Sequence, residues 1–249
     1  MRLYVLGSSS SGNCYLFESS AGEVLMVEAG VKFSEVKKAL DFDLSGMVGC
    51  LLSHEHSDHS KYAKDVMNAG INVYTSTGTM RGMKMDYGKT HRLHALFHKT
   101  LMMVGNFLIF PFDVKHDAKQ PFGFLIKHPE MGTTLFLTDS FYVEYKFEGL
   151  NNILIEANYA EDILDANIEA GKLPDVVRNR VIQSHMELET VKELLKANDL
   201  KAVNNIVLLH LSSGNSHAER FKNEIAELTG KTVTVADSHM VINLNKTPF

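Results

Sequence analysis

The residues best suited to chemistry stand in the segment SHEHSDH, residues 53–59, which follows an apolar run. An extended chain at this point places His54 and His56, two residues apart, on one side of the segment. Asp58 and His59 then turn the chain into a helical pattern. Such a density of imidazole and carboxylate groups suits Zn²⁺ or a similar first-row metal, and a catalytic site of that kind leaves one coordination position for water. The alternative is a solvated loop, but the flanking strand and helix favour a metal site.

Three further residues of ligand type stand at the ends of apolar runs elsewhere in the chain. His116 follows FLIFPFDV, Asp139 follows TTLFLT, and His210 ends NNIVLLH. A single histidine beside a strand is usually an ordinary polar residue, whereas three residues with the same placement favour a shared site. We therefore expect these three side chains to complete the site that residues 53–59 begin.

The elements that must position these side chains differ between the two halves of the chain. The first half has short β-branched and aromatic runs bounded by turn formers, which predict strands at 2–7, 14–19, 23–30, 47–53, 72–76, 100–104, 107–114, 122–128 and 133–138. Helical patterns occur at 34–40 and at 58–69, the second closed by Gly70.

The second half alternates strands with helices. Strands are expected at 151–157, 204–211, 231–236 and 240–244, and helices at 160–171 and 215–229. Ser184 and Glu187 fit a capping box for a further helix, whose apolar face is Leu188, Val191, Leu194 and Leu195. Strands first and mixed pairs later indicate an α/β (α+β) protein with two sheets and outer helices.

Composition limits the class of protein. The 249 residues are 45% hydrophobic and 22% charged, which excludes a disordered, collagen-like or low-complexity chain. Without a linker, repeat or biased tract, one domain covering residues 1–249 is expected. No apolar stretch approaches the ~18 residues of a membrane span, and the first residues do not form a signal peptide. Cys14 and Cys50 give neither a disulfide framework nor a CxxC metal pair. These features predict a cytoplasmic protein without a membrane partner.

The order HxHxDH, single His, single Asp and final His at strand ends resembles the metallo-β-lactamase fold superfamily. Further blocks resemble its YycJ/WalJ-like branch, namely LGSSSSGNCYLFES near the start, HDAKQPFGFLI at 116–126, IEANYAEDIL at 155–164, SHMELETV at 184–191 and LLHLSSGN at 208–215. The resemblance implies a four-layer αβ/βα sandwich, with two mixed sheets face to face, helices on both outer faces and metals at one rim.

The resemblance also implies two divalent metal ions, Zn²⁺ or Mn²⁺. Its pattern assigns His54, His56 and His116 to the first ion, and Asp58, His59 and His210 to the second, with Asp139 bridging. Two such ions can hold a bridging hydroxide and clamp a phosphoryl oxygen for in-line displacement. Asp58 and Asp139 are then the expected catalytic carboxylates that orient the hydroxide.

His185 is a further catalytic candidate, as the acid or oxyanion partner for the leaving group. The alternative is that it only caps and packs a helix. The chain also departs from the superfamily pattern. Glu28 stands where Asp is usual, which predicts a change beneath the metals. The block usually reading GHLSN is SHMELE here, so its Ser-Asn pair is lost.

Candidate substrate contacts come from three segments. GSSSSGN, residues 7–13, either presents backbone amides to a phosphate or simply turns a β-hairpin. The stretch 81–99 has five Lys/Arg and three His against one acid, and either meets phosphates or forms a solvated face. The third segment is the late HLSSGN block. The predicted contacts are Ser9, Ser10, Asn13, Arg81, Lys84, Lys89, Arg92, Ser212 and Asn215.

The function predicted is a dinuclear metal-dependent hydrolase, foremost a phosphodiesterase or exonuclease-like nuclease. DNA is favoured over RNA because the chain has no room for the cap of larger RNA-processing relatives. The net charge of −5 does not exclude nucleic acid, because the field that matters is local. The alternatives are a small-molecule hydrolase of the same fold (a cyclic-nucleotide phosphodiesterase, thioesterase or lactamase-like enzyme) and a metal-free binding module. No oligomeric state is predicted.

Overall fold

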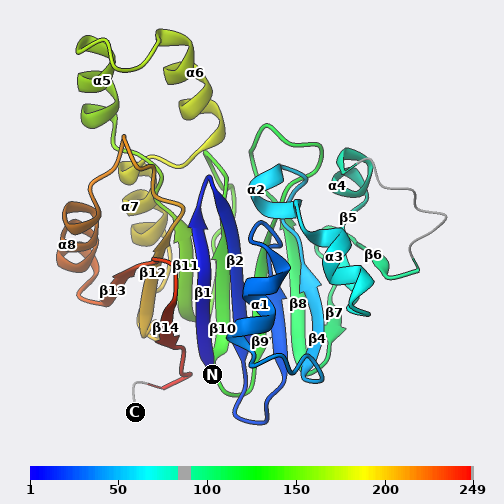
Figure 1. The fold of residues 1–249 in the computed structure, drawn as a ribbon. Coiled ribbons are helices and arrows are strands. Elements are labelled where there is room, and N and C mark those ends of the chain that lie inside the picture. Colours follow the sequence, from blue (N-terminus) through cyan, green and yellow to red (C-terminus); the bar gives the residue numbers. More distant parts are fainter. Residues whose placement is uncertain (84–90, 248–249) are drawn as a thin grey trace.

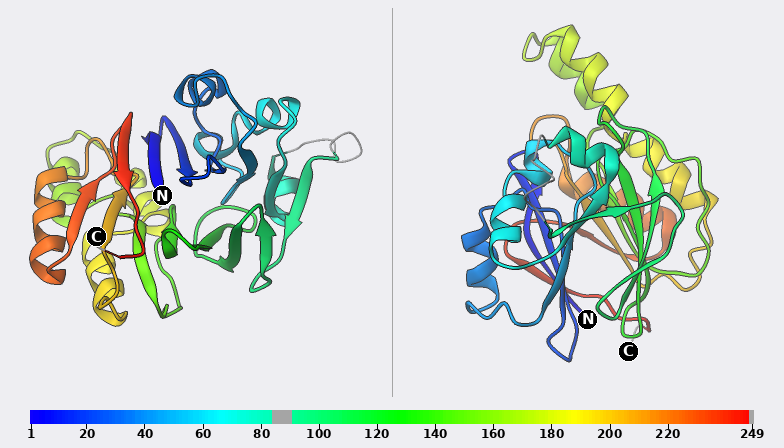
Figure 2. Two further views of the ribbon diagram at one scale, coloured as in Figure 1. Left: turned by 90° about the horizontal axis from the view of Figure 1, so that it is seen from below. Right: turned by 90° about the vertical axis from the view of Figure 1, so that its right-hand side faces the viewer.

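The computed structural model describes residues 1–83 and 91–247. Two sheets face each other and carry helices on their outer sides (Figures 1 and 2). The first sheet contains, in spatial order, β14 (Met240–Asn243), β1 (Arg2–Ser9), β2 (Gly12–Glu18), β3 (Val24–Val27), β4 (Met47–Leu51), β5 (Val73–Ser76) and β6 (Leu93–Leu96). The second contains β13 (Thr232–Val235), β12 (Asn205–Leu209), β11 (Leu150–Glu156), β10 (Gly132–Leu137), β9 (Phe122–His128), β8 (Phe107–Asp113) and β7 (Met102–Val104).

Each sheet mixes parallel and antiparallel pairs. In the first, β3 to β6 are parallel and the remaining neighbours are antiparallel. In the second, β10 to β13 are parallel and β7 to β10 are antiparallel. The loop after β4 leads into α2 (Ser57–Ser60), which lies at one end of the sheets, and the start of β1 and the end of β14 lie at the other end (Figure 1).

Alternation along the strands divides the core into three layers. In β2, Tyr15 and Phe17 face the interior between the sheets, whereas Cys14 and Leu16 face the outer side of the first sheet. All four are fully buried, because the outer side is also covered. The strands therefore read as unbroken apolar runs rather than as alternating ones.

Helices cover both outer faces. α1 (Phe33–Ala39) and α3 (Ala63–Asn68) pack on the first sheet, and α7 (Leu188–Ala197) and α8 (Ala218–Thr229) pack on the second. The predicted four-layer arrangement of two mixed sheets with outer helices is therefore confirmed. α4 (Thr77–Gly82) follows β5, and α5 (Glu161–Glu169) and α6 (Asp175–Ser184) project as a pair beyond the sheets (Figure 1). Within the described ranges, no helix is long and apolar enough to cross a membrane.

The predicted capping box of Ser184 and Glu187 is wrong. Glu187 is itself the N-cap of α7, and its carboxylate accepts a hydrogen bond from the N–H of Thr190 at 3.2 Å. Ser184 instead ends α6, a helix that the sequence pattern did not predict, and its hydroxyl donates to the carbonyl oxygen of Arg180 at 2.6 Å. The local hydroxyl-to-carbonyl bond in the last turn of α6 competes with the capping interaction.

The predicted helix over 58–69 is two short helices, α2 and α3. The N–H of Tyr62 donates to the carbonyl oxygen of Ala29 at 2.9 Å, so it does not continue the hydrogen-bond ladder of α2. This bond ties the loop that carries the first candidate ligands to the end of β3.

Candidate metal centre

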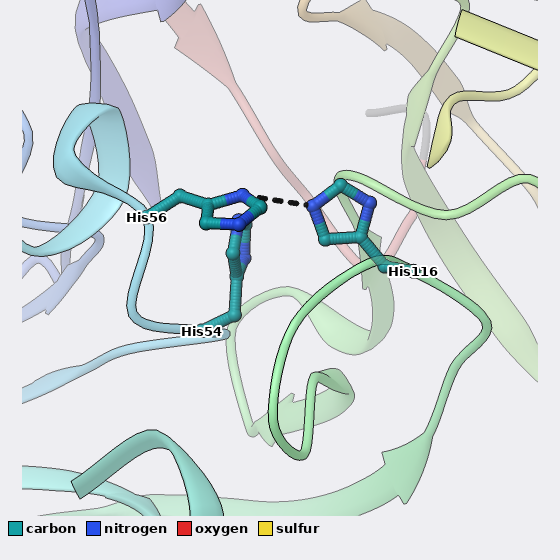
Figure 3. Close-up of side chains that lie close together, drawn as sticks. All are labelled: His54, His56 and His116. Carbon is teal, nitrogen blue, oxygen red and sulfur yellow. Dashed lines mark hydrogen bonds between the residues drawn. The ribbon is translucent and has the colours of Figure 1, made fainter. Parts of the chain in front are cut away.

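The first group of candidate ligands combines a loop of one sheet with a loop of the other. His54, His56 and His116 each offer a nitrogen within 4.8 Å of the others. Their rings lie edge-on to one another, and His56 Nδ1 lies 3.1 Å from His116 Nε2 (Figure 3). His54 Nδ1 lies 2.8 Å from Ser53 Oγ, and His116 Nδ1 lies 2.6 Å from the carbonyl oxygen of Ser184. These outer contacts direct Nε2 of both rings into the centre.

The second group contains Asp58, His59, Asp139 and His210, again within 4.8 Å of one another. His59 Nε2 lies 3.2 Å from Asp58 Oδ2 and 3.3 Å from Asp139 Oδ1. His210 Nε2 lies 3.5 Å from the same Asp58 oxygen. Two imidazoles and two carboxylates therefore enclose one point, with α2 on one side and the end of β12 on the other.

Asp139 lies between the two groups. Its Oδ2 is 3.8 Å from His116 Nε2 and 4.0 Å from His54 Nε2, whereas its Oδ1 faces the second group. The hydroxyl of Thr138 donates to Oδ1 at 2.9 Å and holds the carboxylate in this orientation. This is the position that a bridging ligand requires.

The residues present fit divalent metal ions. His54 Nε2 and His210 Nε2 are buried and have no hydrogen-bond partner among the described residues, an arrangement that costs free energy unless another group satisfies them. The 3.1 Å separation of His56 Nδ1 and His116 Nε2 is close to the roughly 3.3 Å expected between two tetrahedral zinc ligands at about 2.0–2.1 Å. Mixed imidazole and carboxylate donors suit Zn²⁺ or Mn²⁺.

The charges of the two groups differ. Burial alone would lower the pKa of His210, but the carboxylates of Asp139, Asp58 and Glu156 raise it to about 10. Burial likewise opposes protonation of His59, and Asp139 and Glu28 outweigh it and raise its pKa. In the first group, burial and the neighbouring imidazole of His59 lower the pKa of His54. The carboxylates in and around the second group therefore favour positive charge there, whether it is carried by protons or by a metal cation, whereas the first group contains a neutral imidazole, that of His54.

Glu28 and Asn13 contact the two ring nitrogens of His59. Glu28 is fully buried, its Oε1 accepts from the N–H of Ser53 at 3.3 Å, and its Oε2 lies 3.6 Å from His59 Nδ1. Asn13 Nδ2 lies 3.1 Å from His59 Nε2 and 3.4 Å from Asp58 Oδ2. Glu28 also has φ 66°, a left-handed conformation that a non-glycine residue keeps only where its surroundings hold it. The longer side chain predicted to alter this region therefore contacts the outer nitrogen of a candidate ligand.

Glu156, at the end of β11, is a site residue that sequence reasoning missed. Its Oε1 lies 2.7 Å from His185 Nδ1 and 3.0 Å from His210 Nδ1. Its Oε2 accepts from the N–H groups of Ser140 and Met186 at 3.0 and 3.1 Å. The signal was present, because an acid ends the apolar run NNILIE just as the other ligands end theirs.

His185 stands beside the second group without belonging to its core. Its ring centroid is 5.4 Å from that of His210, and its Nδ1 is 3.8 Å from Asp139 Oδ2. Burial lowers its pKa, but the carboxylate of Glu156 outweighs this and raises it. The side chain is 20% exposed, so part of the imidazole is accessible to a bound molecule.

The chain is similar to known proteins in both sequence and fold. No protein-family model matches the chain. The chain is 24% identical over 236 residues to exodeoxyribonuclease YycJ of Bacillus anthracis, a match that covers 90% of this chain and 87% of that protein. Among solved structures, the metallo-β-lactamase fold protein YhfI from Bacillus subtilis superposes with a TM-score of 0.72 at 18% identity, over 97% of this chain and 99% of that one. The chain has the metallo-β-lactamase fold.

A second structure of this kind carries metal. Zn²⁺-bound PqqB from Methylobacterium extorquens superposes with a TM-score of 0.74 at 14% identity, over 98% of this chain and all of that one. The resemblance to the metallo-β-lactamase fold noted in the sequence is thus confirmed, and the similarity to YycJ agrees with the branch that the sequence blocks indicated.

The two serine-rich blocks, residues 7–13 and 210–215, lie beside the candidate metal centre of this metallo-β-lactamase fold, and both form turns. Ser9 pairs with Gly12 across the β1–β2 hairpin, and Ser10 is exposed at its tip. Asn13, expected to touch substrate, is fully buried against His59 and Asp58. In the late block, the N–H of Asn215 donates to Ser212 Oγ at 3.3 Å, which closes a turn after His210.

The basic stretch is divided by the fold. Arg81 is exposed on α4, a helix whose Gly78 packs against the loop that follows His116. Arg92 precedes β6, and its guanidinium donates to Asn72 Oδ1 at 3.2 Å, at the amino ends of the parallel strands. The ligands occupy the opposite ends, so the structure does not bring Arg92 to the centre. Lys84 and Lys89 lie outside the described residues.

Gly30 allows the ligand loop of this metallo-β-lactamase fold to approach β3. A Cβ at this position would lie 1.7 Å from the carbonyl oxygen of Asp58 and 2.7 Å from the N atom of Asn13. We expect Gly30→Ala to displace α2, lower the melting temperature by roughly 2–12 °C and reduce the bound metal. Thermal melts and elemental analysis of metal per chain check this. Gly214→Ala is the control, because a Cβ there meets nothing within 4 Å; equal behaviour of the two variants would contradict the prediction.

Proposed function

We propose that this protein is a dinuclear metal-dependent phosphodiesterase, a nuclease that shortens DNA from an end. The observation that carries the proposal is the convergence of three imidazoles on one side of Asp139 and two imidazoles with Asp58 on the other. The similarity to a protein described as an exodeoxyribonuclease, over 90% of this chain, supports DNA as the substrate.

The ligand assignment follows the two groups. His54, His56 and His116 would hold one ion, and Asp58, His59 and His210 the other, with Asp139 between them. When bound, two Zn²⁺ or Mn²⁺ ions supply an activated water molecule at neutral pH and polarise a phosphoryl oxygen. Asp58 has the more exposed carboxylate of the two acids, at 18% against 3% for Asp139. It is therefore the better placed to accept a hydrogen bond from the attacking water.

His185 is the proposed donor of a proton to the leaving alkoxide. Glu156 engages its Nδ1 at 2.7 Å, which fixes the ring and leaves Nε2 as the nitrogen available for a substrate oxygen. Glu187, not His185, caps the start of α7, whereas His185 is the C-cap residue of α6 through its backbone N–H, a role that does not occupy its imidazole. A DNA substrate agrees with a cytoplasmic location, as do the free thiols of Cys14 and Cys50, both buried.

A matrix of metals and substrates tests the proposal. Chelator-stripped protein, reloaded with Zn²⁺ or Mn²⁺, is offered end-labelled single- and double-stranded DNA, RNA, bis-p-nitrophenyl phosphate, nitrocefin and a lactoyl thioester. We expect metal-dependent, stepwise shortening of DNA from one end and slower hydrolysis of the small diester. Hydrolysis of only the small diester, the lactam or the thioester would contradict the nuclease function and assign the protein to the small-molecule hydrolases.

A further inference from the structure

Two exposed aromatic side chains follow the candidate bridging ligand directly. Phe141 is 39% exposed and Tyr142 is 51% exposed. The N–H of Phe141 donates to the carbonyl oxygen of Lys115 at 2.9 Å, and Tyr142 pairs with Lys115 in an isolated antiparallel bridge. Because Lys115 precedes His116, and Phe141 comes two residues after Asp139, the backbone of both aromatic residues is anchored beside the centre.

The backbone that carries these rings is held by hydrogen bonds from the site itself. The N–H of Ser140 donates to Glu156 Oε2 at 3.0 Å, and its hydroxyl donates to the carbonyl oxygen of Tyr142 at 2.9 Å. Rings on an ordered backbone lose little conformational entropy when they bind a ligand. Contiguous exposed apolar side chains on a protein surface commonly mark a binding site.

The exposed surface continues from these rings to the loop between β6 and β7. The ring of Tyr145 is half-buried against Phe112, with centroids 5.8 Å apart. Lys99 Nζ lies 4.7 Å from the centroid of Tyr145, and the ring of His98 lies 6.2 Å from it. Phe97, which precedes His98 in the chain, is 57% exposed. We name Phe97, His98, Lys99, Phe141, Tyr142 and Tyr145 the aromatic track.

A small cavity opens beside the aromatic track. It has a volume of about 240 Å³ and lies between the segment 142–146 and α7. Tyr142 and Tyr145 line one side, and Thr190 and Glu193 of α7 line the other, with Asn198 just beyond the end of that helix. The carboxamide of Asn198 already accepts from the N–H of Phe147 and donates to the carbonyl oxygen of Leu194, both at 2.6 Å, so the aromatic faces are what the cavity offers a planar ligand such as a nucleobase.

Cations lie along the track beside acids. Glu144 is paired with Lys115 at 3.2 Å, whereas His98 Nδ1 accepts a hydrogen bond from the N–H of Asp113 at 3.0 Å and does not neutralise the carboxylate of that residue. Lys99 lies over the ring of Tyr145, where a cation and an aromatic face are offered together. A groove that combines cations with stacking rings is the usual way to bind single-stranded nucleic acid.

We propose that the aromatic track binds the unpaired nucleotides of a nucleic-acid substrate while the scissile phosphate lies at the metal centre. The inference rests on the nuclease function proposed above and names the form of its substrate. A single strand is the occupant because only unpaired bases expose their faces to protein rings, whereas the bases of a duplex are stacked on one another. The track begins beside His116 and Asp139, so the strand passes directly from the rings to the reacting phosphate.

Binding and hydrolysis are measured separately to test this. Fluorescence anisotropy follows a labelled twelve-nucleotide oligothymidylate and a labelled duplex of the same length, on the Asp58→Ala background, which prevents cleavage. Phe141→Ala and Tyr142→Ala are each expected to weaken binding of the single strand roughly 5- to 150-fold, the range for the loss of one stacked base. Tyr142→Phe should bind the single strand as tightly as the protein with Tyr142, and the affinity of every variant for the duplex should change little. With Asp58 intact, hydrolysis of bis-p-nitrophenyl phosphate should keep its wild-type rate in all these variants.

Phe42→Ala is the matched control, because Phe42 is 72% exposed in the connection between α1 and β4. If wild-type protein shortens DNA and the ring variants behave like Phe42→Ala, the track is overturned and the nuclease function stands. If wild-type protein neither binds nor cleaves nucleic acid, both the aromatic track and the nuclease function are contradicted. An equal loss of activity on bis-p-nitrophenyl phosphate would show that the rings only stabilise the structure of the metal centre. A changed molecular mass in light scattering would show that the aromatic track is a contact between protein chains. Either result overturns the proposal.

Discussion

Asp58→Ala is expected to lower metal-dependent hydrolysis of a phosphodiester at least about a thousandfold, with the fold retained. The carboxylate lies 3.2 Å from His59 Nε2 and 3.5 Å from His210 Nε2, so its removal opens the second group of ligands. It also removes the proposed acceptor for the attacking water. His116→Ala should have a similar effect, because it takes one of three nitrogens from the first group. Rates with bis-p-nitrophenyl phosphate and far-ultraviolet circular dichroism measure the two outcomes.

The control for this prediction is Asp65→Ala. Asp65 is an exposed acid in the first turn of α3, close in sequence to Asp58 but outside the candidate centre. Its loss should leave both activity and fold unchanged. A doubly substituted protein, Asp58→Ala with His116→Ala, that still hydrolyses the diester would refute the dinuclear centre.

Glu156→Gln is expected to lower hydrolysis about 10- to 100-fold and to destabilise the protein by about 1–3 kcal/mol. The carboxylate faces four nitrogens, two from the backbone and two from the imidazoles of His185 and His210. A glutamine has one acceptor oxygen, and its NH₂ group donates. It therefore turns a donor towards either the backbone N–H groups or the imidazoles, whichever way it is oriented.

Steady-state kinetics and thermal melts measure the two effects of Glu156→Gln. Glu227→Gln, an exposed position on α8, is the control for the same chemical change and should leave both quantities as in the wild type. Unchanged kinetics in Glu156→Gln would show that His185 and His210 do not depend on this carboxylate for their orientation.

The candidate centre depends on the packing of the two sheets against each other. His54, His56, Asp58 and His59 follow a strand of the first sheet, whereas His116, Asp139, Glu156 and His210 lie at strand ends of the second. Fully buried side chains between the sheets, such as Tyr15 and Phe136, whose rings are 5.3 Å apart, hold the two halves together. A loss of packing in this layer would therefore separate the two sets of ligands.

Local spacing made part of this arrangement predictable. Three histidines and an aspartate within residues 53–59 indicate a metal site, because side chains so close along the chain must lie close in space. The strands were predictable as well, since runs such as NNIVLL and TTLFL are short and contain β-branched or aromatic residues, which favours a buried strand over a helix. Two sheets with outer helices followed from the order of these elements, whereas their mixed strand directions and face-to-face packing were implied by the resemblance to the metallo-β-lactamase fold.

Non-local packing decided the rest. In the sequence, Glu156 is not distinguished from other acids that follow a strand. Only the fold places its carboxylate 2.7 Å from His185 Nδ1, 29 residues further along the chain. Arg92 is part of the basic stretch in the sequence, but the direction of the strands places it at the amino ends of β5 and β6, away from the ligands. Phe141 and Tyr142 lie beside the centre because their segment hydrogen-bonds to Lys115. Side-chain periodicity specifies which face of an element is buried, whereas the direction and neighbours of each strand depend on how the whole chain minimises exposed apolar surface.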